Sequence, residues 1–170
     1  NASGTWSNDR TARTFKRGKN EDVNDKPLKK LVDERGWLTE IWRTDQVSEK
    51  VRPVMTYISQ TEPGVVRGPH EHVAQTDYFA FLGPGNFKLC LWDNREHSAT
   101  YDTYQEQVVG QDAPTVVVIP EGVVHAYKNV SHIPGIVINC PNQLYAGENY
   151  AEPVDEIRHE DEADTPFVVK

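Results

Sequence analysis

Short runs rich in β-branched and aromatic residues recur along most of the chain, and this recurrence restricts its fold more than any other feature. From about residue 28 onward they include VMTYISQ, DYFAFL, NFKLCLW, TVVVIP and GIVINC. Turn-forming groups of Gly, Pro, Asn and Asp, such as Gly83-Pro84-Gly85, separate them. Regularly spaced short strands without a helix-length amphipathic pattern predict an all-β antiparallel sandwich or barrel. Only the acidic stretch AEPVDEIRHEDEAD suggests a short helical or irregular C-terminal tail.

Length and charge bound the organisation of the chain and its partners. The 170 residues are enough for one domain with a buried core. Residues 1–27 are polar and without clear periodicity, so we expect an N-terminal arm there and a single domain over residues 28–170. The formal net charge of -8 argues against nucleic acid or an anionic membrane as the main partner.

The compartment is predicted from what the sequence does not contain. No apolar run approaches the roughly 18 residues of a membrane span, and no signal-peptide core is visible, so we expect a cytoplasmic protein. Cys90 and Cys140 lie in apolar, strand-like runs. We therefore expect two buried, reduced thiols rather than a disulfide.

Two clusters of ligand-type residues lie between residues 70 and 129. The first contains His70, His72 and Asp77, and the second leads to His125 within PEGVVHAYKN. In an extended segment His70 and His72 point to the same face, whereas Asp77 follows at an odd offset and needs a bulge or turn to join them. Three imidazoles and one carboxylate converging in a barrel suit a divalent metal such as Zn, Fe, Mn, Co or Ni.

The two clusters resemble the two conserved motifs of the cupin superfamily. The second motif matches from Pro120 to Asn129, and the first matches at His70 and His72, with Asp77 in the position of its glutamate. The resemblance implies a double-stranded β-helix, or jelly-roll barrel, preceded by an N-terminal strand arm.

Within the cupins, the wider chain resembles the dTDP-4-dehydrorhamnose 3,5-epimerase family over about residues 28–165. The matching segments are Asp33-Glu34-Arg35-Gly36 with Glu40, Arg67-Gly68-Pro69-His70, Asp93-Asn94-Arg95 with Ser98, Pro120 to Tyr127, and Tyr145-Ala146-Gly147-Glu148. The resemblance implies an isomerase that performs epimerase-like proton transfer on a nucleotide-linked 4-keto-6-deoxy sugar, without an organic cofactor. It also implies a homodimer, in which N-terminal strands extend the sheet of the partner subunit and cover its edge.

The resemblance also assigns roles to individual residues. His70 is implied as the base that removes a carbon-bound proton, and Asp161 in the acidic C-terminal stretch as the carboxylate behind it. Arg35, Glu40 and Arg67 are implied to hold the sugar hydroxyls and the diphosphate, because planar guanidinium donors suit phosphate oxygens.

Three positions depart from the family pattern. The family has Gln at the position of His72, Lys at the position of Asp77, and a general-acid Tyr near Ile138-Asn139. Asp77 removes a positive charge where negative charge would develop, and a metal acting as Lewis acid would restore it. His70 cannot both ligate a metal and accept the substrate proton through one nitrogen. With a metal bound, the candidate bases are Tyr57, Tyr127, Glu71 and Tyr145.

Two further functions are compatible with the sequence. One is a metal-dependent cupin oxygenase or lyase that acts on a small polar substrate. The other is a non-catalytic sugar-binding cupin, which is consistent with the missing Lys and Tyr. Uptake of solvent deuterium into a keto sugar indicates the isomerase, oxygen consumption the oxygenase, and binding without turnover the sugar-binding protein.

Overall fold

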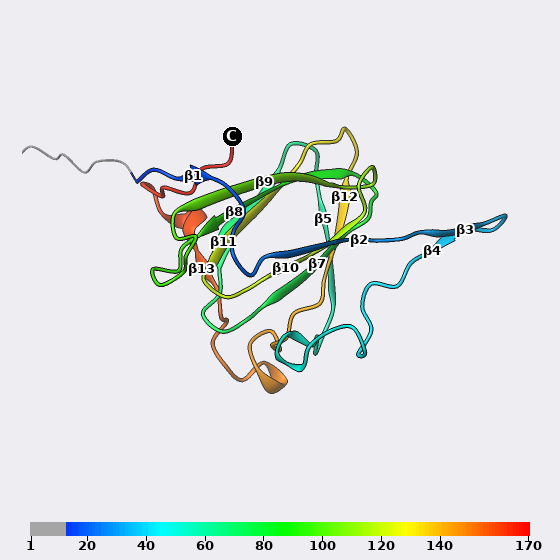
Figure 1. The fold of residues 1–170 in the computed structure, drawn as a ribbon, viewed down its shortest axis with the longest axis horizontal. Helices are drawn as coiled ribbons and strands as arrows, with labels where there is room; N and C mark the ends of the chain where they lie inside the picture. Colours follow the sequence, from blue (N-terminus) through cyan, green and yellow to red (C-terminus); the bar gives the residue numbers. More distant parts are fainter. Residues whose placement is uncertain (1–12) are drawn as a thin grey trace, which may run out of the picture.

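Two sheets packed face to face contain most strands of the computed structural model, which describes residues 13–170 (Figure 1). The six-stranded sheet has the order β1 (Lys16–Arg17), β9 (Thr103–Gly110), β8 (Asn86–Asp93), β11 (Val123–Asn129), β6 (Val66–Glu71) and β13 (Ile157–Arg158). The five-stranded sheet has the order β2 (Asn24–Pro27), β10 (Thr115–Ile119), β7 (Asp77–Phe81), β12 (Gly135–Asn139) and β5 (Tyr57–Thr61). The chain alternates between the sheets, which gives a jelly-roll barrel and confirms the predicted all-β class.

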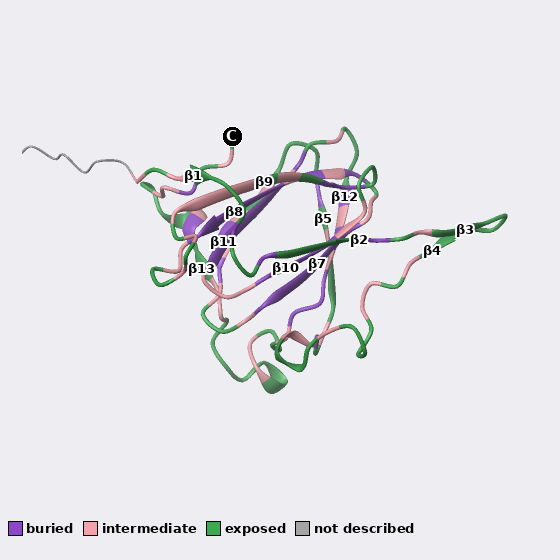
Figure 2. Ribbon diagram, in the orientation of Figure 1, coloured by how far each residue is buried: buried purple, intermediate pink, exposed green. Residues whose placement is uncertain are grey.

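A two-stranded hairpin projects from the barrel (Figure 1). It consists of β3 (Leu31–Asp33) and β4 (Gly36–Leu38), which pair only with each other among the described residues. Its residues are exposed, as the green colouring of β3 and β4 in Figure 2 shows. Val32 is 76% exposed and Trp37 48%. Because the chain leaves about half or more of each of these apolar side chains uncovered, the hairpin offers apolar surface for another molecule.

The interior of the barrel has an aromatic part and a polar part. Alternate residues of β11 point inward, so Val123 and Tyr127 join the interior cluster while Val124 and Ala126 face outward. Tyr127 packs edge-on against Phe79, with ring centroids 5.7 Å apart, as part of a group of four rings. His125 lies between these inward positions on the same strand, so the histidine cluster is continuous with the core.

Both sheets are also covered on their outer faces. The C-terminal segment places Phe167 on Trp92, Val124 and Ala126 of the six-stranded sheet. On the other side, the segment that contains Trp42 and the 3-10 helix η1 (Glu49–Val51) lies near the five-stranded sheet, with Trp42 packed on it. Burial on both faces explains why the strand runs read as nearly continuous apolar stretches.

The expected N-terminal arm and C-terminal tail differ in outcome. Residues 13–27 are part of the barrel, because β1 pairs with β9, β2 pairs with β10, and Val23 is 1% exposed. The part of the expected arm at residues 13–27 therefore belongs to the barrel, and the expected boundary between residues 27 and 28 does not separate the two. The rest of the expected arm, residues 1–12, lies outside the described residues. The tail contains the 3-10 helices η2 (Glu148–Tyr150) and η3 (His159–Asp161) and no α-helix, which agrees with the expected short helical or irregular tail. No helix in residues 13–170 is long and apolar enough to cross a membrane.

Candidate active site

A one-residue bulge in β6 turns Arg67 and His70 to the same side of the sheet. His70 lies opposite His125 and Arg67 opposite Tyr127, so three steps along β6 match two steps along β11. Gly68 lies in the bulge at φ +88°, and a Cβ there would be 2.6 Å from the carbonyl oxygen of His125. Only glycine tolerates this approach in this backbone conformation, so the bulge sets the inward direction of His70.

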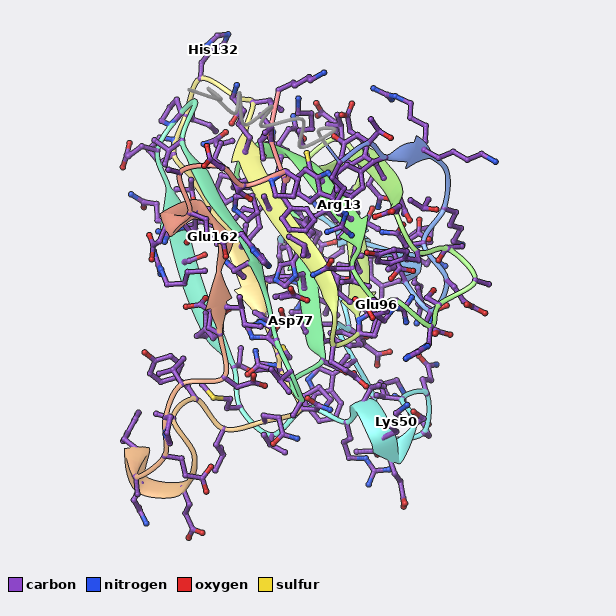
Figure 3. All side chains as sticks on the ribbon, turned by 90° about the vertical axis from the view of Figure 1, so that its left-hand side faces the viewer. Arg13, Lys50, Asp77, Glu96, His132 and Glu162 are labelled. Carbon is purple, nitrogen blue, oxygen red and sulfur yellow. The ribbon has the colours of Figure 1, made fainter. Side chains whose placement is uncertain are left out.

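The four residues that the sequence predicts as metal ligands come together at one end of the barrel. The ring nitrogens of His70, His72 and His125 lie within 4.8 Å of one another. Asp77, labelled in Figure 3, reaches them from β7 of the opposite sheet. Its Oδ2 lies 2.9 Å from Nε2 of His72 and 3.0 Å from Nε2 of His125. The odd sequence offset of Asp77 is resolved by a turn between β6 and β7, as expected.

The second nitrogen of two imidazoles is held by the main chain. Nδ1 of His72 contacts the carbonyl oxygen of Asp155, and Nδ1 of His125 lies 3.1 Å from that of Val123. A carbonyl oxygen can only accept a hydrogen bond, so Nδ1 carries the proton in both rings. If such a ring is neutral, its Nε2 has no proton and directs a lone pair at Asp77. The lone pairs and the carboxylate repel one another unless protons or a cation lie between them. The same backbone anchoring orients histidines that bind metals.

His125 has an unsatisfied nitrogen. Its side chain is 1% exposed, and its Nε2 lies 3.0 Å from Oδ2 of Asp77 without forming a hydrogen bond to it. Nε2 is thus a buried polar atom without a hydrogen-bond partner among residues 13–170. A buried group of this kind calls for an explanation such as a bound ion.

The pKa values within the cluster diverge. Burial and the neighbouring His125 lower the pKa of His70 to about 2. Burial opposes protonation of His72 as well, but its hydrogen bond to Asp77 raises its pKa to about 9. Although burial acts to raise it, the pKa of Asp77 is held well below its usual range by His125 and His72. At neutral pH the cluster therefore combines a neutral His70 with a cationic His72 and an anionic Asp77.

Glu156, rather than the predicted Asp161, is the carboxylate beside His70. Its Oε1 lies 3.7 Å from Nδ1 of His70, and both side chains are largely buried. Asp161 instead forms an ion pair with Arg158 at 3.1 Å, and its side chain is 66% exposed. The structure therefore does not bring Asp161 to His70, because η3 turns it to the surface.

The predicted substrate-binding residues are dispersed. Arg35 lies at the turn of the β3–β4 hairpin, 82% exposed and paired with Asp33, and Glu40 is exposed and paired with Arg43. Within one chain neither contacts the histidine cluster. Arg67 lies on β6 itself and donates from Nε to the hydroxyl of Thr61, at 2.8 Å, on β5.

The alternative bases named from the sequence are separated by the fold. Glu71 points to the outer face of the sheet, where it lies 2.8 Å from His159, so it cannot serve an interior site. The hydroxyl of Tyr127 lies 3.3 Å from that of Ser59, within the aromatic part of the interior. Tyr57 and Tyr145 both line a cavity beside the histidines.

This cavity has a volume of about 630 Å³ and opens beside the cluster. His72, Gln75 and Glu156 give it a polar side, and Tyr57 and Tyr145 give it aromatic surface. A cavity of this size accommodates a small-molecule ligand, and concave sites with a few converging polar groups are typical of active sites. A second cavity of about 440 Å³ lies on the outer face of the five-stranded sheet and includes none of the three clustered histidines.

Two residues that support the site were not found from the sequence. The carboxylate of Asp155 accepts the backbone N–H groups of Val73, Ala74 and Gln75 at 2.8–2.9 Å, which fixes the turn before Asp77. Asn139 donates to Asp77 at 2.8 Å. Asp155 acts over about 80 residues of sequence, so no local pattern could reveal it.

The jelly-roll barrel and its three interior histidines define a cupin. A model of the dTDP-4-dehydrorhamnose 3,5-epimerase family matches residues 21–163. The chain belongs to this family, which confirms at family level the predicted epimerase-type isomerase.

Relatives and solved structures agree with this assignment. The chain is 35% identical to the "Probable low-salt glycan biosynthesis epimerase Agl13" of Haloferax volcanii over 136 residues, 79% of this chain and 85% of that protein. It resembles the dTDP sugar isomerase of Desulfovibrio desulfuricans with a TM-score of 0.73, at 24% identity and covering 88% and 91% of the two chains. The Legionella pneumophila dTDP-6-deoxy-D-glucose-3,5-epimerase, solved with dTDP-4-keto-L-rhamnose, gives a TM-score of 0.69 at 20% identity, covering 84% and 74%. At these identities the two solved structures establish a shared fold.

Proposed function

We propose that the protein epimerises a nucleotide-linked 4-keto-6-deoxy sugar by proton transfer at a carbon next to the ketone. The observation that carries the proposal is the His70–Glu156 pair, because Glu156 lines the cavity and holds its carboxylate 3.7 Å from His70. Family membership supports it, as does the keto-sugar nucleotide bound to the Legionella relative.

His70 is the base in this proposal. An unprotonated imidazole accepts the proton, and the Glu156 carboxylate, 3.7 Å from Nδ1, stabilises the imidazolium that forms. Removing the proton leaves negative charge on the substrate oxygen as an enolate. In this proposal His72, on the lining of the same cavity, stabilises the enolate through its positive charge alone, because its two N–H groups are bonded to Asp77 and to the carbonyl of Asp155.

We also propose that substrate binding is completed by a second copy of the chain in a homodimer. The diphosphate of a sugar nucleotide needs cationic partners in a protein with a net charge of -8. Arg35 is too far along the projecting hairpin to serve its own cluster, and the hairpin exposes apolar side chains. An interface formed by the hairpin would bury these side chains and carry Arg35 towards the partner subunit.

The cytoplasmic location expected from the sequence remains a prediction.

The test uses dTDP-4-keto-L-rhamnose, the ligand of the Legionella relative, incubated with the protein in D₂O. Deuterium incorporation at the carbons next to the ketone, lost in His70→Asn, is the expected result. The number of deuterium atoms reports whether one or two carbons react. Absence of exchange with the wild-type protein overturns the proposal. Oxygen consumption would then favour the oxygenase, and tight binding without turnover the sugar-binding protein.

A divalent cation at the cluster is a second proposal for the same site. His72, His125 and Asp77 would hold it, with His70 as a fourth ligand within reach, and the unpartnered Nε2 of His125 supports it. A cation there would supply positive charge to stabilise an enolate. These donors, two or three imidazoles and one carboxylate, suit Zn and the neighbouring transition metals.

Metal content by mass spectrometry on untagged protein tests the cation site. Near-stoichiometric metal in the wild type and its loss in His125→Ala are expected. His132→Ala, at an exposed loop histidine, is the matched control and should retain the metal. Wild-type protein that takes up no metal, even after incubation with Zn²⁺ and removal of the excess, overturns the cation site and leaves protons to bridge the cluster.

A further inference from the structure

Tyr57 and Asn139 face each other across the β5–β12 ladder. They are direct partners in the register of these antiparallel strands, and the side-chain amide of Asn139 donates to the Tyr57 hydroxyl oxygen at 2.9 Å. Asn139 is completely buried. In the family pattern a general-acid tyrosine lies near the position where this chain has Ile138 and Asn139. The structure places a different tyrosine, Tyr57, on the adjacent strand opposite Asn139.

The orientation of the Asn139 amide is fixed by its other bonds. Its Oδ1 accepts the backbone N–H of Tyr78 at 3.0 Å, so its Nδ2 is the donating end. Nδ2 has two protons and donates them to Tyr57 and to Oδ1 of Asp77, at 2.9 and 2.8 Å. Asn139 therefore ties the Tyr57 oxygen to the polar cluster.

This arrangement leaves the hydroxyl proton of Tyr57 uncommitted. The oxygen acts as an acceptor towards Asn139, and within residues 13–170 the hydroxyl donates to no acceptor. Burial and the nearby Asp77 raise the pKa of Tyr57, so it remains protonated at neutral pH. Tyr57 also lines the 630 Å³ cavity. The free proton is thus held at the side of the candidate substrate site.

Tyr57 and His70 belong to different walls of the barrel. Tyr57 lies on β5 of the five-stranded sheet, and His70 lies on β6 of the six-stranded sheet. Glu156, the partner of His70, lines the same cavity as Tyr57. Inversion of a carbon requires that one group removes a proton from one face and another group returns a proton to the opposite face. Groups on two facing sheets meet this requirement.

We propose that Tyr57 is the proton donor that completes inversion, and that Asn139 is the positioning residue that holds its hydroxyl. The proposal rests on the proposed function. His70 takes the proton from carbon, and the electron pair moves into the enolate. The O–H bond of Tyr57 then breaks as the new C–H bond forms on the other face. Water returns a proton to the phenolate and takes one from the imidazolium, so the net change is an isomerisation.

The experiment separates exchange from inversion in Tyr57→Phe, with dTDP-4-keto-L-rhamnose in D₂O as probe. Wild-type protein should incorporate deuterium and form the epimer together. Tyr57→Phe should still incorporate deuterium, because His70 can return a solvent deuteron to the original face, while epimer formation falls by about 10²-fold or more. Tyr101→Phe, at a surface tyrosine distant in sequence from the site, should behave as wild type.

The outcomes distinguish the two proposals. Inversion at the wild-type rate by Tyr57→Phe overturns the role of Tyr57 and leaves the epimerase proposal intact. Loss of both exchange and inversion, in a variant whose thermal unfolding remains cooperative, also overturns it. Absence of exchange in the wild type overturns the proposed function and this role together. Continued exchange by the variant itself shows that the protein is folded.

Discussion

Glu156 lies beside His70, with Oε1 3.7 Å from Nδ1, although four other acidic residues follow it within eight positions. The pairing of β13 with β6 determines which carboxylate lies there. It places Arg158 opposite His70 and so brings Glu156, two residues before Arg158, to the edge of the cluster. The carboxylate that supports the base is therefore selected by strand pairing.

Replacing this carboxylate should impair turnover without unfolding the protein. We expect Glu156→Gln to lower the rate of deuterium exchange by about 10²-fold, because the imidazolium of His70 loses the negative charge next to it. Asp161→Asn is the comparison, because Asp161 pairs with Arg158 at the surface. A larger loss of exchange in Asp161→Asn than in Glu156→Gln, measured in one assay, would show that Glu156 is not the carboxylate that supports His70.

The bulge that directs His70 should be sensitive to a single methyl group. Gly64 and Gly68 both have positive φ, but an added Cβ meets no atom within 4 Å at Gly64 and a carbonyl oxygen at 2.6 Å at Gly68. We expect Gly64→Ala to cost about 1 kcal/mol in the free energy of unfolding, from backbone strain alone. Gly68→Ala should cost about 1–3 kcal/mol more, from overpacking. If Gly64→Ala and Gly68→Ala have equal midpoints and slopes in urea denaturation, the close approach at Gly68 does not limit the side chain at that position.

Acid should destabilise the protein through Asp93. Its carboxylate is completely buried and accepts the hydroxyls of Ser98 and Thr100, both at 2.6 Å, and the guanidinium of Arg95. Burial alone would raise its pKa, but these donors lower it from 3.8 to about 2. A depressed pKa stabilises the fold above pH 3.8, and this contribution, about 2 kcal/mol, is lost as the pH falls from 4 to 2.

Urea denaturation between pH 2 and pH 6 measures this effect. The difference in unfolding free energy between wild type and Asp93→Asn should shrink by about 2 kcal/mol towards pH 2. Asp45→Asn, at an exposed carboxylate paired with Arg43, is the control. A difference for Asp93 that does not change with pH would show that its charge does not stabilise the fold.

The projecting hairpin should determine the oligomeric state. We expect the wild type to be a dimer by light scattering, and Trp37→Ser with Leu38→Ser to shift it towards monomer, because both side chains are exposed in the single chain. Val108→Ser, at an equally exposed apolar residue on β9, should leave the dimer intact. A monomeric wild type at micromolar concentration would remove the hairpin from the proposed substrate site.

The sequence was sufficient for the features that depend on local periodicity. The strand runs, the shared face of His70 and His72, and the turn needed before Asp77 follow from the alternation of side chains in extended chain. The free, buried state of Cys90 and Cys140 was predicted as well, and both are unpaired in the structure. These properties depend on residues close together in the chain.

Features that join distant segments could not be predicted in this way. Val23 and the strand at residues 24–27 read as polar arm, yet pairing with β10 builds them into the barrel. Acidic residues near the C-terminus look alike in sequence, but the fold brings the carboxylate of Glu156 to His70 and the backbone carbonyl of Asp155 to His72. The register of β5 and β12 alone brings Tyr57 to Asn139.

The sequence by itself determined the strand periodicity and the ligand-type residues of this protein, because side-chain chemistry and two-residue alternation are properties of neighbouring positions. Only the tertiary structure decided which carboxylate supports His70, which tyrosine faces the cavity and which segment projects. The physical reason is that strand pairing, register and burial depend on the free energy of the whole fold, in which chemically equivalent residues are separated by where the backbone places them.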